Sequence, residues 1–441
     1  MFPRHVPVMA ARASELHRQL RYFERQDVAR QNAILAAQLK HLATHAARHS
    51  PYWTEKLSGA TIASPVLADI LRAIPPLSRK DLQDRYEDLI ARFSGRETLK
   101  IAIQSSSGST GKPVRVQVIQ NVHMPLYYAS LMVDARWHKP DPKKRFAHLT
   151  AKVEDNDRVP VGVPFNWFGP VGYGFSFRTK DRTDGEIYEH CAQRKPSYLN
   201  CGPTTVVRLA RCALQSGRDD LRPELAFTFG SAVTEETRDL ARRGLGTKII
   251  DCYSCEETGY IAAQCRVHEY FHVLSPTNLV EIVDDNNEPC PVGTPGRVLI
   301  TALHSYAMPL LRYEIGDVAE WGAPCDCGVT LPVIKKLWGR TQHIIVNPDG
   351  GKIFARTYAR DFEDIAGLQE YRFVLHEGRV VVAQIVASHA APELAAMVAT
   401  RVQRALNFPY PVIVRQVDAI DWGKSWKQET FAVSDAPAIP S

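Results

Sequence analysis

Between residues 198 and 262 the sequence alternates stretches typical of helices with short stretches typical of strands. The expected helices are 205–216 and 235–243, and the expected strands are 225–229 and 248–251. Strands that are separated by helices usually pair in parallel, so this order predicts a doubly wound α/β sheet. Ligands bind such a sheet at the carboxyl ends of its strands. The segments after the two strands are therefore candidate binding loops: Gly230, Ser231 and Ala232, and the stretch 252–259.

The regions around this alternation indicate how the chain is divided. Residues 11–49 carry an apolar stripe at helical spacing, which predicts two helices that end before Pro51. A further helix is expected over 78–93, with Ser78 as its N-cap. Strands are expected over 279–283, 296–303 and 309–313. We therefore predict a large N-terminal α/β domain, formed by a helical cap (1–95) and a core with a β-rich section (96–338).

The end of the chain restarts a separate pattern. Strands are expected over 371–376, 379–387 and 411–417, and a helix is expected over 392–406. This pattern predicts a small, mobile C-terminal α+β domain over 339–441.

Composition narrows the classes of function. The chain has 441 residues, of which 45% are hydrophobic, so it can bury a sizeable core. Its net charge of +6 includes no block of five like charges, so we expect no nucleic-acid partner. No apolar run of 18 residues occurs, and the first residues lack the apolar core of a signal peptide. We therefore expect a cytoplasmic protein without a membrane partner.

A glycine- and serine-rich loop, SSSGSTGKP at 105–113, lies between two β-rich stretches, 99–104 and 114–119. Its small residues allow backbone N–H groups to converge on an anion, and Lys112 adds a positive charge. The loop is not the P-loop of ordinary NTPases, because Pro113 occupies the position where that motif needs Ser or Thr. The composition indicates a phosphate site, with a flexible surface turn as the alternative.

The loop and four later motifs occur in the order found in the adenylate-forming superfamily, which includes acyl-CoA synthetases, peptide-synthetase adenylation domains and luciferase. The motifs are SSSGSTGKP at 105–113, YSCEE at 253–257, RYEIGD at 312–317, GR at 339–340 and GK at 423–424. They span nearly the whole chain, and the sequence most resembles the phenylacetate–CoA ligase branch.

The resemblance implies that the chain binds ATP and gives each motif a role. The loop residues that would hold the phosphates are Ser105, Ser106, Ser107, Gly108, Ser109, Thr110, Gly111 and Lys112. Tyr253 would lie against the adenine, Asp317 would bind the ribose hydroxyls, and Glu257 would bind the Mg²⁺ that bridges the phosphates. Arg340 would mark a swivel between the domains. Lys424 would stabilise the reacting phosphate, with Lys427 as a second candidate.

Three positions depart from the family pattern. Ser254 stands where Gly is usual, Glu256 where Thr or Ser is usual, and Gln342 where Asp or Lys is usual. The adjacent carboxylates of Glu256 and Glu257 leave open which of the two binds Mg²⁺.

The implied reaction is attack of a carboxylate on the α-phosphate of Mg·ATP, which gives an acyl-adenylate and pyrophosphate. The branch favours a small, aromatic acid as substrate and CoA as the acyl acceptor. An amine or carrier-protein acceptor and a homodimeric state stay open. A catalytically silent nucleotide-binding protein is a further alternative, against which the intact Lys112, Glu257, Asp317 and Lys424 argue.

Residues 161–177 contain aromatic residues and glycines in a pattern that fits neither a helix nor an ordinary strand. The segment could form an aromatic wall for a flat organic substrate, or it could be a core loop with packed rings.

Four residues suggest a structural zinc site. The nine cysteines are scattered and do not form a disulfide framework. Cys265, His272, Cys325 and Cys327 provide three thiolates and one imidazole, which is a closed tetrahedral ligand set for Zn²⁺. A similar arrangement occurs in some phenylacetate–CoA ligase relatives. His268 is a competing ligand, and four unconnected residues are the alternative.

Overall fold

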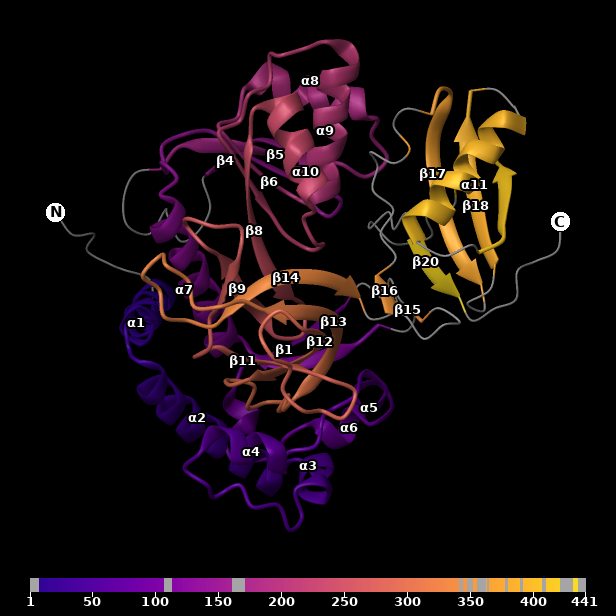
Figure 1. The fold of residues 1–441 in the computed structure, drawn as a ribbon. Helices are drawn as coiled ribbons and strands as arrows, with labels where there is room; N and C mark the ends of the chain where they lie inside the picture. Colours follow the sequence, from indigo (N-terminus) through magenta and orange to yellow (C-terminus); the bar gives the residue numbers. More distant parts are fainter. Residues whose placement is uncertain are drawn as a thin grey trace. The chain divides into compact units, whose positions relative to one another are not determined.

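The computed structural model describes residues 8–106, 113–160 and 171–340, and parts of the C-terminal region (Figure 1). The described C-terminal parts are 344–346, 352–354, 362, 365–376, 380–388, 392–406, 410–420 and 431–434. The chain divides into two compact units: the first comprises Met1–Val233 and Leu240–Leu337, and the second comprises Thr234–Asp239 and Trp338–Ser441.

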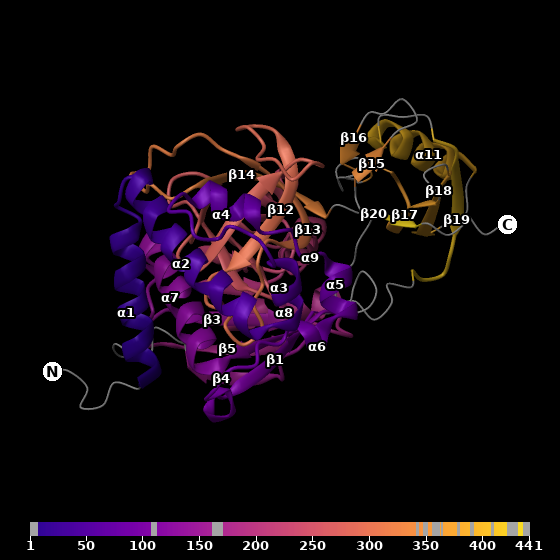
Figure 2. The same ribbon diagram turned by 90° about the horizontal axis from the view of Figure 1, so that it is seen from below.

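Short and long α-helices precede the glycine- and serine-rich loop at 105–113, which we call the phosphate loop. They are α1 (Val8–Phe23), α2 (Val28–His49), α3 (Pro51–Lys56), α4 (Leu67–Ala73), α5 (Arg79–Asp84) and α6 (Tyr86–Leu89). The two helices expected over 11–49 are confirmed as α1 and α2, and α1 packs against α7 (Gln120–His138) (Figure 2). Among the described helices, none has the length and apolarity to cross a bilayer.

The helical region differs from the sequence prediction at two places. Pro51 does follow the end of α2, but it also starts α3, because Ser50 caps the new helix and proline fits the first helical turn. The single helix expected over 78–93 is two short helices, α5 and α6, which are separated where Arg85 leaves the helical conformation. Ser78 is the N-cap of α5, as predicted, and its Oγ accepts from the Asp81 N–H at 3.0 Å.

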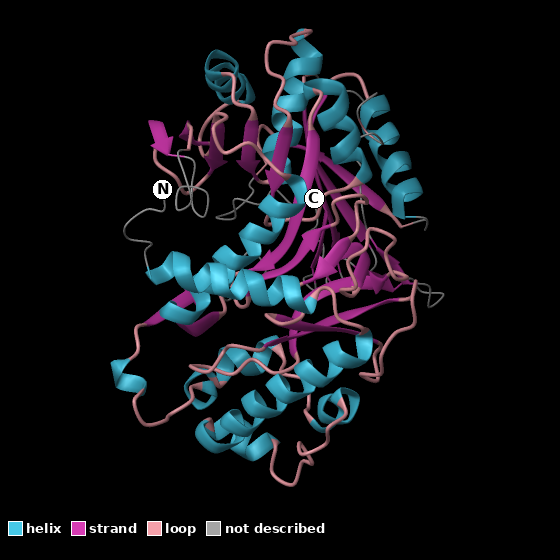
Figure 3. Cartoon of the chain, turned by 90° about the vertical axis from the view of Figure 1, so that its left-hand side faces the viewer, coloured by secondary structure: helices cyan, strands magenta, loops and turns pink. Residues whose placement is uncertain are grey.

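Most of the first unit is built on one mixed sheet of twelve strands, with helices on both sides (Figure 3). The strand order is β11-β12-β13-β14-β10-β9-β8-β7-β6-β3-β5-β4. The strands are β3 (Phe146–Thr150), β4 (Asn156–Pro160), β5 (Tyr173–Arg178), β6 (Tyr198–Cys201), β7 (Leu225–Thr228), β8 (Lys248–Cys255), β9 (Gly259–Gln264), β10 (Phe271–Val273), β11 (Asn278–Val283), β12 (Pro295–Ala302), β13 (Tyr313–Trp321) and β14 (Val333–Arg340).

The predicted α/β class is confirmed by the run β8-β7-β6-β3-β5, in which each strand pairs in parallel with the next. Helices α8 (Asp184–Arg194) and α9 (Pro203–Ser216) form connections between these strands. Apolar residues of both helices and of the strands make one buried core, which includes Leu149, Ile187, Leu199, Val206 and Leu209. The helix expected over 235–243 is α10 (Glu235–Leu240), followed by a π-helical turn at Ala241–Leu245.

Two strands begin or end away from their expected limits. Strand β8 was expected to end at Asp251, but it continues to Cys255 because Cys252 and Tyr253 pair with β9. The strand expected over 309–313 is wrong: β13 begins only at Tyr313, after Arg312 adopts a left-handed conformation with φ of 45°.

Part of the aromatic segment is a strand. Residues 173–178 form β5, which pairs in parallel with β3, although no ordinary strand was expected here. Phe175 and Phe177 are buried in the core, and the Phe177 ring stacks on His190 at a centroid distance of 3.8 Å. Residues 161–170 lie outside the described part of the chain. For Phe175 and Phe177 the core interpretation is therefore confirmed.

The second unit contains a four-stranded sheet in the order β19-β18-β17-β20. Its elements are β17 (Leu368–His376), β18 (Val380–Ala387), α11 (Pro392–Leu406), β19 (Val412–Gln416) and β20 (Phe431–Ser434), and β15 (Ile344–Val346) pairs with β16 (Lys352–Phe354). Apolar residues of α11 and the sheet form a separate core. The four elements expected between 371 and 417 are confirmed, whereas β20 was not predicted.

Candidate nucleotide site and metal cluster

Tyr253 and Asp317 come from strands β8 and β13 and meet in the first unit. The Tyr253 hydroxyl donates a hydrogen bond to Asp317 Oδ2 at 2.8 Å. Asp317 lies where the pairing of β12 with β13 is irregular, because residues 315–317 face only Val298. Gly316, with φ of 82°, accommodates this bulge at little steric cost and thereby sets the direction in which Asp317 leaves the strand.

The adjacent glutamates after β8 have different surroundings. The Glu257 side chain is 6% exposed; its Oε1 lies 3.5 Å from Arg79 Nη1 and accepts from the Tyr313 hydroxyl at 3.3 Å. The Glu256 side chain is 55% exposed, and its Oε1 lies 3.9 Å from Lys152 Nζ. Burial, with a further contribution from the Glu257 carboxylate, raises the pKa of the Tyr313 phenol, which therefore stays protonated and able to donate.

The phosphate loop is mounted on an antiparallel hairpin. As predicted, strands flank it: β1 (Ile101–Ser105) pairs with β2 (Arg115–Ile119). Ser106 closes the base of the loop, since its N–H donates to the Val114 carbonyl at 2.9 Å and its Oγ accepts from the Val114 N–H at 2.9 Å. The exposed Ser105 donates from Oγ to the Ser106 carbonyl at 3.4 Å. The remaining loop residues lie outside the described part of the chain: Ser107, Gly108, Ser109, Thr110, Gly111 and Lys112.

The other expected nucleotide-binding residues are less closely described. Gly230, Ser231 and Ala232 follow β7, beside the segment that leads to Tyr253, because Thr228 pairs with Asp251 in neighbouring β8. The Thr228 hydroxyl donates to Asp251 Oδ1 at 2.7 Å and joins the two strands at this end.

Three expected residues belong to the second unit. Arg340 is the last residue of β14, and only its backbone is described. Lys424 and Lys427 lie outside the described residues. Their roles stay predictions from the sequence.

Two residues near Glu257 were not singled out as site residues from the sequence. Tyr313 belongs to the RYEIGD motif, so the motif itself contains the signal that could have identified it. Arg79 begins α5, and its guanidinium also donates from Nη2 to Ser106 Oγ at 3.4 Å. Nothing in its sequence neighbourhood indicates that it approaches the phosphate loop.

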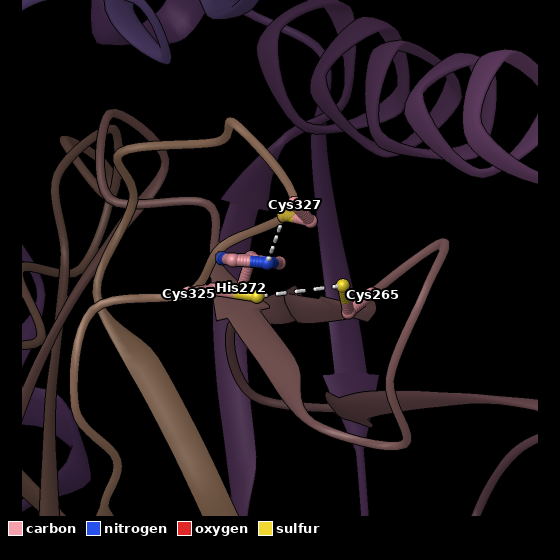
Figure 4. A group of neighbouring side chains, drawn as sticks. All are labelled: Cys265, His272, Cys325 and Cys327. Atoms are coloured by element: carbon pink, nitrogen blue, oxygen red, sulfur yellow. Dashed lines mark hydrogen bonds between the residues drawn. The ribbon is translucent and has the colours of Figure 1, made fainter.

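Four predicted metal ligands come together near strands β9 and β10 (Figure 4). Cys265 follows β9 and His272 lies in β10, while Cys325 and Cys327 lie in the loop between β13 and β14. Their ligand atoms all lie within 4.8 Å of one another, with Sγ atoms of Cys265 and Cys325 at 3.8 Å. His272 Nε2 lies 3.2 Å from Cys327 Sγ. Ligand atoms in tetrahedral zinc sites, with Zn–S of about 2.3 Å, are separated by about 3.5–3.8 Å.

The imidazole of His272 is oriented for a ligand role. Its Nδ1–H donates to the Leu331 carbonyl at 3.3 Å, which leaves the Nε2 lone pair directed toward Cys327. Burial lowers the pKa of His272 and raises that of the Cys327 thiol to about 12. His268 is not part of this cluster; it contacts Asp326 Oδ1 at 2.5 Å and groups with Asp326 and Cys325.

Comparisons with known proteins agree with this architecture. No family model matches the sequence. The chain is 24% identical over 338 residues to a phenylacetate-coenzyme A ligase from Thermus thermophilus, which covers 71% of each protein. Its fold is similar to that of a 2-hydroxyisobutyryl-CoA ligase in a postadenylation state, with TM-score 0.72, 15% identity, and coverage of 94% of this chain and 91% of that chain.

Another solved structure shares the fold over a shorter region. It is the anthranilate CoA ligase AuaEII in complex with anthranoyl-AMP, with TM-score 0.52, 15% identity, and coverage of 76% of this chain and 67% of that chain. These structural matches establish the likeness of the fold, and the relative from Thermus thermophilus adds likeness in sequence. In sequence and fold, the chain is thus similar to CoA ligases, which agrees with the resemblance of its motifs to the adenylate-forming superfamily.

Proposed function

We propose that the chain is an AMP-forming ligase that activates a carboxylic acid with ATP and transfers the acyl group to CoA. The observation that carries the proposal is the convergence of the motifs in the first unit. Tyr253 contacts Asp317, and Glu257 lies near Ser106 at the base of the phosphate loop through their shared neighbour Arg79. Likeness to a phenylacetate–CoA ligase supports this function.

In the proposed first step, a carboxylate oxygen of the acid attacks the α-phosphorus of ATP in line with the departing group. A bond forms between that oxygen and phosphorus, the bond to the β-phosphate oxygen breaks, and pyrophosphate leaves with the electron pair. The loop with Lys112 would hold the leaving phosphates, and Asp317 would accept hydrogen bonds from the ribose. Lys424 would stabilise the charge that develops.

In the second step, the thiolate sulfur of CoA attacks the acyl carbon and AMP leaves with its phosphate oxygen. Between the two steps, the C-terminal domain would rotate about Arg340. Residues of that domain other than Lys424 would then face the adenylate. CoA ligases among the similar proteins favour CoA as the acceptor. An amine acceptor is the second candidate, with Gln342 at the swivel as the sequence feature that motivates it. A small, aromatic acid is the proposed substrate class.

Glu257 is the residue that we propose as the Mg²⁺ ligand. Its carboxylate is buried and lies 3.5 Å from Arg79, which also contacts Ser106, whereas that of Glu256 is mostly exposed. A carboxylate oxygen fits this hard cation, and Mg²⁺ would neutralise charge on the phosphates when bound.

We also propose that Cys265, His272, Cys325 and Cys327 hold a structural Zn²⁺. The donor set fits the ion, since three sulfurs and a correctly oriented imidazole nitrogen surround a common point. All four protein ligands would close the coordination shell, so the ion would link two loops and take no part in the reaction.

Acid-dependent exchange of labelled pyrophosphate into ATP, measured with a panel of carboxylic acids, tests the first step. We expect exchange with at least one small aromatic acid. Mass spectrometry of the products with CoA or amines added then distinguishes thioester from amide. ATP binding without exchange by any acid would instead identify a silent nucleotide-binding protein.

A further inference from the structure

Arg79 occupies a central place between two parts of the nucleotide site. Its Nη1 lies 3.5 Å from Glu257 Oε1, and its Nη2 donates to Ser106 Oγ at 3.4 Å. One guanidinium thus spans the base of the phosphate loop and the carboxylate expected to hold Mg²⁺. Its side chain is 28% exposed, so part of it is open to a ligand while the rest is packed.

The backbone that carries Arg79 is held firmly. The Leu77 N–H donates to the Arg312 carbonyl at 3.0 Å, and the Glu314 N–H donates to the Leu77 carbonyl at 2.9 Å. Leu77 therefore extends the sheet beside Tyr313 in a parallel bridge. Ser78 then caps α5, so Arg79 follows two successive anchored residues. This mounting fixes the backbone from which the Arg79 side chain extends, so less conformational entropy is lost when the guanidinium binds a ligand.

The neighbours of Arg79 favour a function in ligand binding over a purely structural ion pair. At 3.5 Å, the contact with Glu257 is longer than the usual charge-assisted hydrogen bond of about 2.7–2.9 Å. The carboxylate already accepts from Tyr313, and the guanidinium has further N–H groups for another acceptor. A planar guanidinium suits phosphate oxygens because it can donate two parallel hydrogen bonds.

We propose that Arg79 is a phosphate-binding residue of the adenylation step, and that its guanidinium contacts the phosphates that leave as pyrophosphate. This inference rests on the proposed ligase function. Glu257 would hold Mg²⁺ when the ion is bound, and the Arg79 guanidinium, placed between Glu257 and Ser106, would donate to phosphate oxygens. As the bond between the α-phosphorus and the bridging oxygen breaks, its electron pair goes to pyrophosphate, and Arg79 stabilises that added charge.

The test compares Arg79→Met and Arg79→Lys with Lys80→Met. Lys80 is a matched control, because it lies on the same helix, its side chain is 85% exposed, and it pairs with Asp84 at 2.6 Å. Arg79→Met should lower pyrophosphate exchange by about 100-fold, as loss of one preorganised donor to developing charge does elsewhere. Arg79→Lys should recover part of this loss, and Lys80→Met should match the unsubstituted protein.

The second half-reaction separates phosphate binding from general damage. Thioester formation from a prepared acyl-adenylate and CoA involves no pyrophosphate, so Arg79→Met should leave its rate within about twofold, as expected when the lost contact acts only in the first step. Equal loss in both half-reactions would overturn the proposal. So would a change confined to the Mg²⁺ requirement, with full exchange at saturating Mg²⁺, because Arg79 would then only position Glu257.

If no acid supports pyrophosphate exchange, that result would count against the proposed function. The role of Arg79 can then still be tested by measuring ligand binding directly. Calorimetry with Mg·ATP and with Mg·pyrophosphate should then show about tenfold weaker binding to Arg79→Met and intermediate binding to Arg79→Lys, in line with a lost hydrogen bond to a charged group. Unchanged affinity for both ligands would overturn the inference. Thermal unfolding of each variant verifies that the chain is folded, and Arg79→Lys keeps the charge should Arg79→Met be unstable.

Discussion

The Tyr253 hydroxyl donates to Asp317 Oδ2 at 2.8 Å, which joins the YSCEE and RYEIGD motifs directly. If Asp317 accepts from the ribose, Tyr253 helps to orient the acceptor. We expect Tyr253→Phe, which keeps the ring, to raise the KM for ATP about three- to tenfold, because the Asp317 carboxylate is retained and only one hydrogen bond that orients it is lost. Asp317→Asn should have a larger effect, because it removes a charged acceptor. ATP saturation curves in the exchange assay measure both.

Glu256→Gln is the natural control for Glu257→Gln, since the residues are adjacent and differ in burial. Glu257→Gln should raise the Mg²⁺ concentration for half-maximal activity by about tenfold, because an amide is a poorer ligand than a carboxylate. Glu256→Gln should leave it unchanged. The measurement is the pyrophosphate exchange rate as a function of Mg²⁺ concentration. A raised Mg²⁺ requirement in Glu256→Gln but not in Glu257→Gln would assign the metal to Glu256.

Metal analysis should find about one zinc per chain in protein purified without chelator, as expected for a single four-ligand site. Cys327→Ser should lose the zinc and lower the free energy of unfolding. A ligand present at a thousandfold excess over its dissociation constant contributes about 4 kcal/mol. Cys212→Ser is the control, because that cysteine lies on α9 and outside the cluster. Zinc-free protein with full stability would contradict the proposed site.

The buried carboxyl of Asp134 predicts a dependence of stability on pH. It lies on α7, accepts from the Tyr260 hydroxyl, and burial raises its pKa from 3.8 to about 7. At a pH between 3.8 and about 7, Asp134 has lost its proton in the unfolded chain but keeps it in the folded chain. The stabilising contribution is therefore full below about pH 4 and is lost as the pH rises through about 7, by on the order of 4 kcal/mol.

Asp134→Asn imitates the protonated carboxyl and removes this titration. Relative to the unsubstituted protein, it should be equally stable at low pH and more stable at pH of about 8, where the buried carboxylate is charged. Urea unfolding of both proteins at two pH values isolates the effect, because all other titrating groups are shared. A stability difference that is the same at both pH values would show that Asp134 does not titrate in this range.

Lys424→Ala should abolish most pyrophosphate exchange while ATP still binds, because its cation would act on the charge that develops in the transition state. Lys427→Ala separates the two candidates. Exchange measured alongside ATP binding provides the readout, and full exchange by Lys424→Ala would remove that lysine from the mechanism.

Local pattern was sufficient to predict α2, α9 and α11, because each has a continuous apolar stripe that faces a core. It failed where a distant partner decides the structure. Strand β8 continues past Asp251 because β9 pairs with it, and β13 begins late because Arg312 turns into a left-handed conformation. The buried Arg312 binds Glu281 at 3.0 Å and the Ile74 carbonyl at 2.8 Å, and neither contact is visible in the motif.

In the candidate site, too, local sequence predicts some residues, whereas others depend on distant contacts. Motifs identify Tyr253, Glu257 and Asp317, because the chemistry depends on the type of side chain at each position. Arg79 belongs to no motif, and its place beside Glu257 follows from the pairing of Leu77 with Tyr313. Long-range backbone pairing of this kind cannot be read from periodicity.

The bridge between Leu77 and Tyr313 also affects where the protein can be divided. A truncation that begins at the phosphate loop would remove Arg79 and expose the backbone of β13 just before Asp317. The helices ahead of the loop are thus no detachable accessory, and a minimal active fragment of the protein must retain residue 77 and the residues that anchor it.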